Sequence, residues 1–214
     1  TQVMARLPDA TVMMGVPTFY TRLLDQQDLN QEFVAHMRVF ICGSAPLTEQ
    51  TFGEWEQRTG HRILERYGMS ETIINTSNPL EGERVAGTVG YALPGQQVRV
   101  ADEAGVPLPA GEVGMIEVSG PNVFQGYWRM PEKTAEELRE DGFFITGDLG
   151  ALDADGRLSI VGRSKDLVIS GGYNVYPKEV EAVLDEMPEV AESAVIGVPH
   201  RDFGEAVVAV VVAS

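Results

Sequence analysis

The sequence predicts an α/β fold, in which a partial parallel α/β sheet is followed by a small β-rich, barrel-like subdomain and the start of a small α+β domain. Three observations support this: a strand–helix–strand pattern early in the chain, alternating runs broken by turn residues in the middle, and an amphipathic helix followed by two valine-rich runs at the end. We place the three regions at residues 1–82, 83–162 and 163–214, and expect the first two to form one large domain and the third a separate, smaller one.

The first region carries a strand, a helix and a second strand in close succession. The pattern places them at 38–42 (RVFIC), 49–59 and 61–66 (HRILER). Thr48 can cap the helix and Gly60 can end it. A unit of this length implies parallel strands with a right-handed crossover, and ligands bind at the carboxyl ends of such strands. The loops after these strands, 43–46 and 67–71, are therefore candidate binding loops.

The second region reads as strands with one interrupting helix. Runs 96–101 and 112–118 alternate in polarity around a turn, and a second hairpin turns at 153–156 between 150–152 and 157–161. Pro131 suits the first turn of a helix over 131–140. The pattern indicates a small barrel or a distorted sheet.

The third region begins near Gly162. It predicts a strand at 167–169, a flexible Gly171-Gly172 turn, a helix opened by Pro177 and closed by Pro188, and strands at 192–198 and 206–212.

Composition narrows the class of protein. The 214 residues contain 43% hydrophobic and 22% charged residues, as in a soluble globular protein, and carry a net charge of −16. An acidic surface repels phosphate backbones, so nucleic acid is an unexpected partner. The longest apolar run, 206–213, is far shorter than the ~20 residues of a membrane span. A single cysteine, Cys42, indicates a reducing compartment such as the cytoplasm.

Taken singly, the polar candidates have plain structural explanations. Glu71 could be an acid in the first turn of a helix, Asp148 a turn residue after Gly147, and Arg163 and Lys165 solvated charges. Together they suggest a nucleotide site. The run YGMSET offers an aromatic ring, a glycine, a hydroxyl and a carboxylate, which suit a triphosphate with Mg²⁺. Asp148 could accept bonds from two ribose hydroxyls.

Four segments, in order, carry a family resemblance: YGMSET, GMIEVSGPNVFQGYW, FFITGDLG and GRSKDLVISGGYNVYPKEVE. They resemble the later core motifs of the adenylate-forming acyl-CoA synthetases, and the resemblance covers essentially the whole chain. The runs INTSNP, GPNVFQGYWRMPEKT and GGYNVYPKEVE are most similar to malonyl-CoA synthetases. The resemblance implies an acid–thiol ligase that uses ATP, Mg²⁺ and coenzyme A, with a small carboxylic acid as substrate.

The resemblance also implies roles for residues that match its motifs. Tyr67 would stack near adenine, and the other residues expected to contact the nucleotide are Gly43, Ser44, Ala45, Glu65, Gly68, Asp148 and Arg163. Ser70 stands where Thr is more usual and keeps the phosphate-binding hydroxyl, and Glu71 would ligate Mg²⁺. Lys165 would lie at the hinge between large and small domains. Gly171 and Gly172 would lie on the loop that approaches the pantetheine arm, and Ser44 would lie near the acid.

Two elements of the family are expected outside these residues. The Ser/Thr/Gly-rich phosphate loop would precede residue 1. The adenylation lysine would follow residue 214, because the chain's three lysines are Lys133, Lys165 and Lys178. We therefore expect the chain to be a fragment that is inactive alone.

The acid is expected to be malonate or a substituted malonate. A dicarboxylic acid must bury its second carboxylate, which requires a fixed cation, and Arg66 directly precedes Tyr67. Strand alternation could instead turn Arg66 toward a structural carboxylate. Three other functions remain open: a ligase for fatty or aromatic acids, a non-catalytic adenylate-binding fragment, and an adenylation domain that loads a carrier protein.

Overall fold

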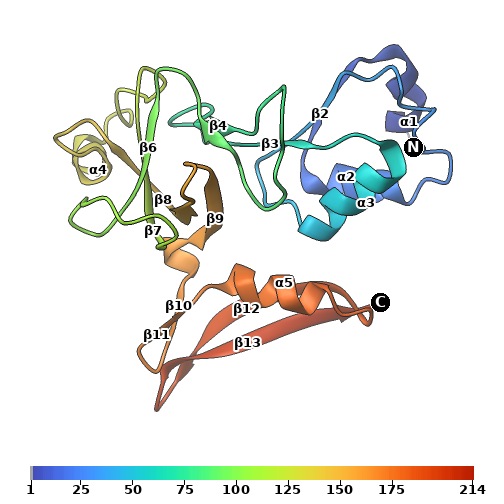
Figure 1. Cartoon of the computed structure of the whole chain (residues 1–214). Coiled ribbons are helices and arrows are strands. Elements are labelled where there is room, and N and C mark those ends of the chain that lie inside the picture. The colour runs from blue at the N-terminus through green and yellow to red at the C-terminus, as the bar shows by residue number, and fades with distance from the viewer. Residues whose placement is uncertain (1) are drawn as a thin grey trace.

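A computed structural model describes residues 2–214, and its strands form three sheets (Figure 1). The first sheet contains, in spatial order, β1 (Val12–Gly15), β2 (Val39–Cys42), β3 (Leu64–Tyr67), β4 (Thr76–Ser77) and β5 (Tyr91–Ala92). Its first three strands run parallel, and the last two pair antiparallel. The predicted parallel βαβ unit is confirmed.

The helix of this unit has the predicted ends. In α3 (Glu49–Thr59) the Thr48 hydroxyl accepts a hydrogen bond from the backbone N–H of Thr51 at 3.1 Å. Gly60 follows the helix with φ of 73°, a left-handed conformation that glycine adopts without strain. The helix buries Phe52 and Trp55 on its core face. The cap, the stop and the apolar face therefore all act as the sequence predicts.

Two helices and a strand near the N-terminus were not predicted. They are α1 (Gln2–Arg6), which a 3₁₀ turn η1 (Leu7–Asp9) follows, α2 (Pro17–Leu24) and β1. Helix α2 buries Tyr20, whose ring meets Trp55 edge to face at 4.9 Å between centroids. Strand β1 extends the parallel sheet beyond β2, so the first sheet has a larger core than the sequence suggested.

The second sheet is antiparallel. Its order is β6 (Gln97–Ala101), β7 (Gly114–Ser119), β8 (Phe144–Leu152) and β9 (Leu158–Arg163). The β6–β7 and β8–β9 hairpins match the predicted pairs. Strand β8 is longer than predicted and contains Asp148, so the alternative that this residue lies in a turn is wrong.

The helix beside this sheet is shorter than predicted. Helix α4 (Pro131–Glu137) was expected to continue to residue 140, but Leu138 is extended and forms a bridge with Phe144. The Arg139 side chain then reaches the buried carboxylate of Glu117, with Nε 2.7 Å from Oε1. This ion pair holds the chain after the helix against the sheet.

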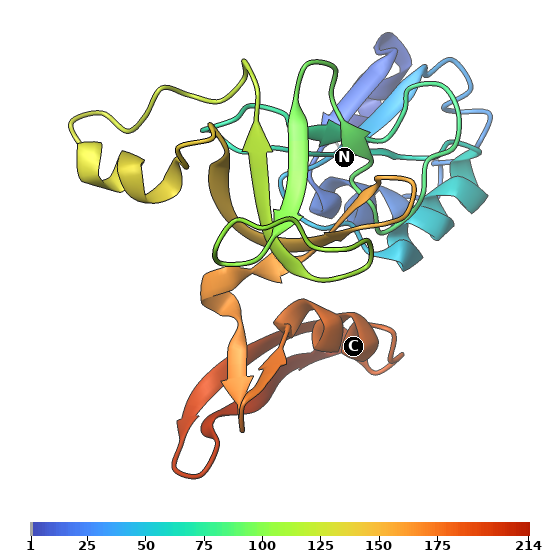
Figure 2. The same cartoon turned by 60° about the vertical axis from the view of Figure 1, so that its left-hand side comes forward.

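The third sheet is also antiparallel and has the order β11-β10-β13-β12. Its elements are β10 (Val168–Ser170), β11 (Tyr173–Val175), α5 (Pro177–Asp185), β12 (Val190–His200) and β13 (Gly204–Ala213). The short 3₁₀ turn η2 (Ser164–Asp166) leads into it from β9. Both views place this sheet and α5 below the other two sheets (Figures 1 and 2).

No helix within residues 2–214 combines the length and the apolar character that crossing a bilayer requires. The division of the chain at residues 82 and 162 stays a prediction.

Candidate active site

The candidate site lies where β2 and β3 end. These strands are parallel, and Cys42 pairs with Glu65, so the loop after β2 runs beside the end of β3. Gly43 is buried there, and a Cβ on it would lie 2.9 Å from the backbone oxygen of Arg66. Ser44, which has a φ of 70°, and Ala45 follow and are exposed. The two predicted binding loops therefore meet at one edge of the sheet.

A buried hydrogen bond joins the first sheet to the second. The Tyr67 hydroxyl donates to Oδ2 of Asp148 at 2.6 Å across 81 residues of sequence. Oδ1 of the same carboxylate lies 3.1 Å from Nε of Arg163, the residue that faces Asp148 across the β8–β9 pair. Tyr67, Asp148 and Arg163, which come from motifs far apart in the sequence and are expected to contact the nucleotide, are thus neighbours in the fold.

Tyr67 is more buried than an exposed stacking platform would be. Its side chain is 8% exposed and packs with Val100, Ile116, Val118 and Leu158. Burial, and then the nearby Asp148 carboxylate, raise the pKa of Tyr67, so the phenol keeps its proton and remains the donor. Stacking on adenine stays a prediction, while placing Asp148 is a second role that the sequence did not indicate.

The turn after β3 is fixed by its own backbone. A Cβ on Gly68 would lie 1.9 Å from the backbone oxygen of Ile73, so only glycine fits there. Gly68 was expected to admit a ligand; in the structure the close approach is to the chain itself. The turn presents Ser70 to solvent and leaves Glu71 half-buried, and it is a turn and not the start of a helix.

Three hydrogen bonds from a distant segment hold this turn. The backbone N–H of Phe124 donates to the Glu71 carbonyl at 2.8 Å, and the Asn122 amide donates to the Thr72 carbonyl at 2.7 Å. The Tyr127 hydroxyl lies 3.1 Å from Oε1 of Glu71. This segment, GPNVFQGY, carries part of the family resemblance, but the sequence predicts no role for Asn122 or Tyr127.

Glu71 suits a magnesium ion that is bound mainly through substrate phosphates. Mg²⁺ prefers oxygen ligands and usually takes one or two carboxylates together with waters and phosphates. Glu71 supplies one carboxylate, with the Ser70 hydroxyl beside it in the turn. Among residues 2–214, no group of three or more His, Cys, Asp and Glu side chains could hold a metal. The donor set therefore fits a metal that arrives with ATP.

Glu65 and Arg66 form a second polar pair of neighbours at the edge. Glu65 is 5% exposed, its Oε1 has no hydrogen-bond partner among the described residues, and burial raises its pKa to about 8. Arg66 is half-buried, its Nη2 lies 3.3 Å from Sδ of Met14, and its buried Nε has no partner in residues 2–214. No carboxylate in that range forms an ion pair with Arg66, so the structural partner considered above is not found.

The predicted hinge and glycine loop lie outside this cluster. Lys165 is in η2 and lines a pocket of about 390 Å³ between β9, η2, α5 and β12. Gly171 and Gly172 turn the β10–β11 hairpin with φ of 58° and 85°. Figure 1 places this β10–β11 hairpin well away from β3 and β4.

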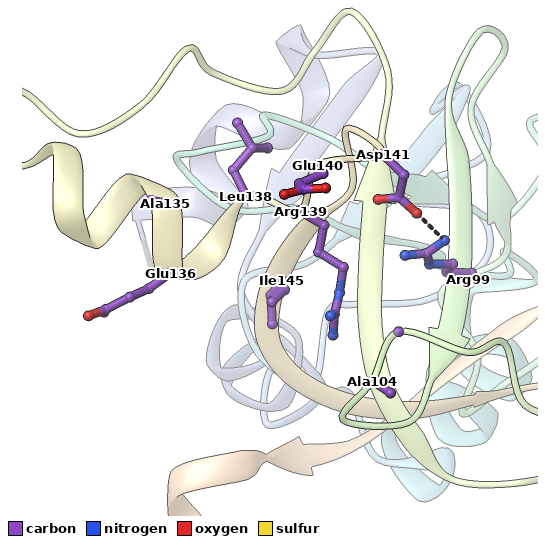
Figure 3. Close-up of a pocket in the computed structure, with 10 residues that line it drawn as sticks. Arg99, Ala104, Ala135, Glu136, Leu138, Arg139, Glu140, Asp141 and Ile145 are labelled. Carbon is purple, nitrogen blue, oxygen red and sulfur yellow. Dashed lines mark hydrogen bonds and ion pairs between the residues drawn. The ribbon is translucent and has the colours of Figure 1, made fainter.

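A larger pocket, of about 430 Å³, lies elsewhere, between α4 and the second sheet (Figure 3). Its arginines are already engaged: Arg99 and Arg139 both pair with the fully buried Glu117, and Arg99 also pairs with Asp141 at 2.8 Å. Replacing either arginine would leave a buried charge short of partners. We interpret this pocket as the border of a structural ion-pair network.

Comparison with known proteins points to one family. A family model described as AMP-binding enzyme matches residues 6–128, and one described as AMP-binding enzyme C-terminal domain matches residues 179–214. The Probable CoA ligase CCL8 of Humulus lupulus is 44% identical over 211 residues, which are 94% of this chain and 35% of that protein. The Malonate--CoA ligase of Arabidopsis thaliana is 43% identical over 212 residues, which are 95% of this chain and 34% of that protein.

Solved structures agree. ATP-bound MatB from Rhodopseudomonas palustris is 63% identical to this chain and superposes with a TM-score of 0.97 over 100% of this chain and 42% of MatB. The apo structure of the same protein superposes with a TM-score of 0.83. The chain thus spans about a third of the length of the two curated relatives and less than half of MatB.

Proposed function

The chain belongs to the AMP-binding enzyme family, and from this premise we propose that the whole protein is an ATP-dependent acid:coenzyme A ligase that acts on malonate or methylmalonate. One carboxylate of the acid attacks the α-phosphorus of ATP, and the bond to pyrophosphate breaks. The coenzyme A thiol then attacks the acyl carbon of the adenylate, and AMP leaves with the bonding electrons. The products are the thioester, AMP and pyrophosphate.

The link between Tyr67 and Asp148 carries this proposal. It joins Tyr67, at the end of the strand that leads into the turn bearing Glu71, to a carboxylate from a different sheet, and a ribose needs such an acceptor for its two hydroxyls. Arg163, which contacts Oδ1 of Asp148, is largely exposed. Oδ1 is therefore the oxygen that can also accept a hydrogen bond from a ribose hydroxyl. Mg²⁺ held by Glu71 would neutralise charge on the phosphates. Ser70 is exposed and free to bond a phosphate oxygen.

Arg66 supports the choice of a dicarboxylic acid. Its half-buried guanidinium has no carboxylate partner within the described part of the chain, and such a cation is stabilised when an anion binds. It lies beside Gly43 and Met14, at the ends of β2 and β1, where we expect the acid to bind. The similarity to a malonate–CoA ligase supports the same choice.

The remaining assignments follow from the family. Coenzyme A would approach along the loop of Gly171 and Gly172 after the third sheet turns about Lys165. We propose the cytoplasm as the compartment, which fits a buried cysteine that is not in a disulfide.

The direct test is the stoichiometry of the reaction. The whole protein, with ATP and malonate, should form malonyl-adenylate and pyrophosphate, and adding coenzyme A should release AMP and malonyl-CoA. Mass spectrometry and a pyrophosphate assay would follow these products. Release of ADP and phosphate would exclude adenylation, and a preference for fatty or aromatic acids would correct the substrate.

Arg66→Met tests the acid specificity. We expect kcat/KM for malonate to fall by two or more powers of ten, because removing one partner of a buried charge pair costs roughly 3–5 kcal/mol. Butyrate, which has no second carboxylate, should be used as well as before or better. Arg62→Met is the matched control, since Arg62 is exposed and pairs with Glu56. Equal losses for the two acids would make Arg66 structural.

A further inference from the structure

The hydroxyl of Tyr127 lies between two carboxylates. It is 2.6 Å from Oε2 of Glu137 and 3.1 Å from Oε1 of Glu71. Glu71 is the carboxylate expected to meet the cation, and Glu137 ends helix α4. One phenol therefore connects α4 to the turn after β3, across 56 residues of sequence.

A phenol has a single proton, which the two carboxylates share in a three-centre hydrogen bond with its longer arm to Glu71. The shorter contact is to Glu137. Although burial opposes it, hydrogen bonds from Lys133 and Tyr127 lower the pKa of Glu137, which keeps this carboxylate ionised and a strong acceptor. A phenol keeps its proton at neutral pH, so the Tyr127 hydroxyl remains a donor. Glu137 and Lys133 thus anchor the phenol oxygen beside Glu71.

The position of Tyr127 is fixed from three other sides. Its backbone N–H donates to the Thr134 hydroxyl at 2.9 Å, and its ring meets Phe124 edge to face at 4.8 Å. The preceding Gly126 has no room for a side chain, because a Cβ would lie 2.7 Å from a carbon of Thr134. A side chain held this firmly can restrict a neighbour that is otherwise free to change rotamer.

Resting on the proposed function, we propose that Tyr127 is the positioning residue of Glu71. Its hydroxyl engages Oε1 of Glu71 and turns Oε2 toward the cation that accompanies ATP. Tyr127 itself touches neither the cation nor the phosphates. The conformational entropy of the Glu71 side chain is thus lost on folding and not on binding. This raises the affinity for the metal–nucleotide complex.

Tyr127→Phe in the whole protein is the test, because Phe keeps the ring that packs on Phe124 and so retains the fold. The first readout is the affinity for Mn²⁺ in the presence of a non-hydrolysable ATP analogue, measured by electron paramagnetic resonance. We expect the affinity to fall about five- to tenfold, the size of one lost hydrogen bond. The second readout is adenylate formation against free Mg²⁺: the half-saturating concentration should rise by the same factor, while the rate at saturation stays within about twofold.

Two variants complete the experiment. Tyr91→Phe removes a hydroxyl from β5, where the ring lies near Arg157, and should leave both readouts unchanged. In a Glu71→Gln background, Tyr127→Phe should have no further effect, because Tyr127 acts only through Glu71.

The outcomes separate the two proposals. Wild-type protein that neither binds the metal–nucleotide complex nor forms an adenylate overturns the proposed function, and the role of Tyr127 with it. Active wild-type protein in which Tyr127→Phe behaves like Tyr91→Phe overturns the positioning role alone. So does an equal loss from Tyr127→Phe with and without the Glu71→Gln change.

Discussion

Glu65 is an acidic residue in the interior of the first sheet. Its neighbour across the parallel pair is Cys42, whose pKa burial raises to about 12. A neutral thiol beside it offers no compensation for a negative charge, and the one backbone hydrogen bond, from Leu47, is outweighed by burial. Near neutral pH, Glu65 is therefore largely protonated, and its carboxylic acid group can donate a hydrogen bond into the site.

Glu65→Gln should change how stability depends on pH. The pKa of Glu65 is raised from 4.5 to about 8 in the fold, so its contribution is complete below pH 4.5 and is lost as pH rises through 8. The free energy of unfolding should fall by roughly 1.4 kcal/mol per pH unit across that window. Thermal melts from pH 5 to 8 should show this slope in the wild type and a flatter profile in Glu65→Gln.

Glu54→Gln, an exposed change on α3, serves as control and should follow the wild type. Parallel profiles for wild type and Glu65→Gln would show that Glu65 is ionised in the fold.

At the scale of elements, the sequence predicts best where a pattern is long and its ends are marked. Helix α3 has a cap, a stop and an apolar face, and the β8–β9 hairpin has an Asp-Gly turn. Strand β4, of two residues, and β5 carry no periodicity from which they could be recognised. Helix α2 does carry a local signal: Pro17 opens it, and Tyr20, Leu23 and Leu24, which the fold buries, follow at helical spacing.

The site divides in the same way. Loops after parallel strands are predictable because topology gathers them at one edge. The Tyr67–Asp148 bond and the Tyr127–Glu71 contact are not, because they depend on how separate sheets pack. The predicted helix at 131–140 is longer than α4 for a related reason. The ion pair between Glu117 and Arg139 is a tertiary contact, and it overrides the local helix propensity.

Gly68→Ala tests whether the turn after β3 is rigid. The new Cβ would collide with the Ile73 carbonyl, so the turn must move and carry Glu71 with it. We expect a loss of roughly 2–4 kcal/mol in stability and a large rise in the KM for ATP. Gly53→Ala is a matched control: a Cβ there meets nothing within 4 Å on α3, and the change should stabilise the protein by about 0.5–1 kcal/mol. A Gly68→Ala protein with normal stability and ATP binding would contradict the rigid turn.

At the scale of the whole molecule, the third sheet is placed relative to the other two through η2. The chain superposes on MatB with a TM-score of 0.97 for the ATP-bound structure and 0.83 for the apo structure. Lys165 lies at the middle of η2, where a change in backbone angles would turn the third sheet as a unit. The hinge role remains a prediction of the family resemblance.

Lys165→Pro should separate the two half-reactions of the whole protein. Proline fits a short helical turn and fixes φ near −65°, so adenylate formation should be spared while thioester formation slows by roughly tenfold or more. The two steps can be followed separately, as pyrophosphate release and as coenzyme A consumption from a preformed adenylate. Lys165→Ala controls for the loss of charge. Equal slowing of both steps by Lys165→Pro would argue against a hinge at this residue.

The hydrogen bond between Tyr67 and Asp148 also has a consequence for the order of folding. It closes a loop of 81 residues, and contacts of such separation form only after the chain between them has lost much of its freedom. Helix α3 and the hairpins of the second sheet need no such closure and can form early. We therefore expect the ability to bind nucleotide to return last during refolding, after the signals of helix and strand have recovered.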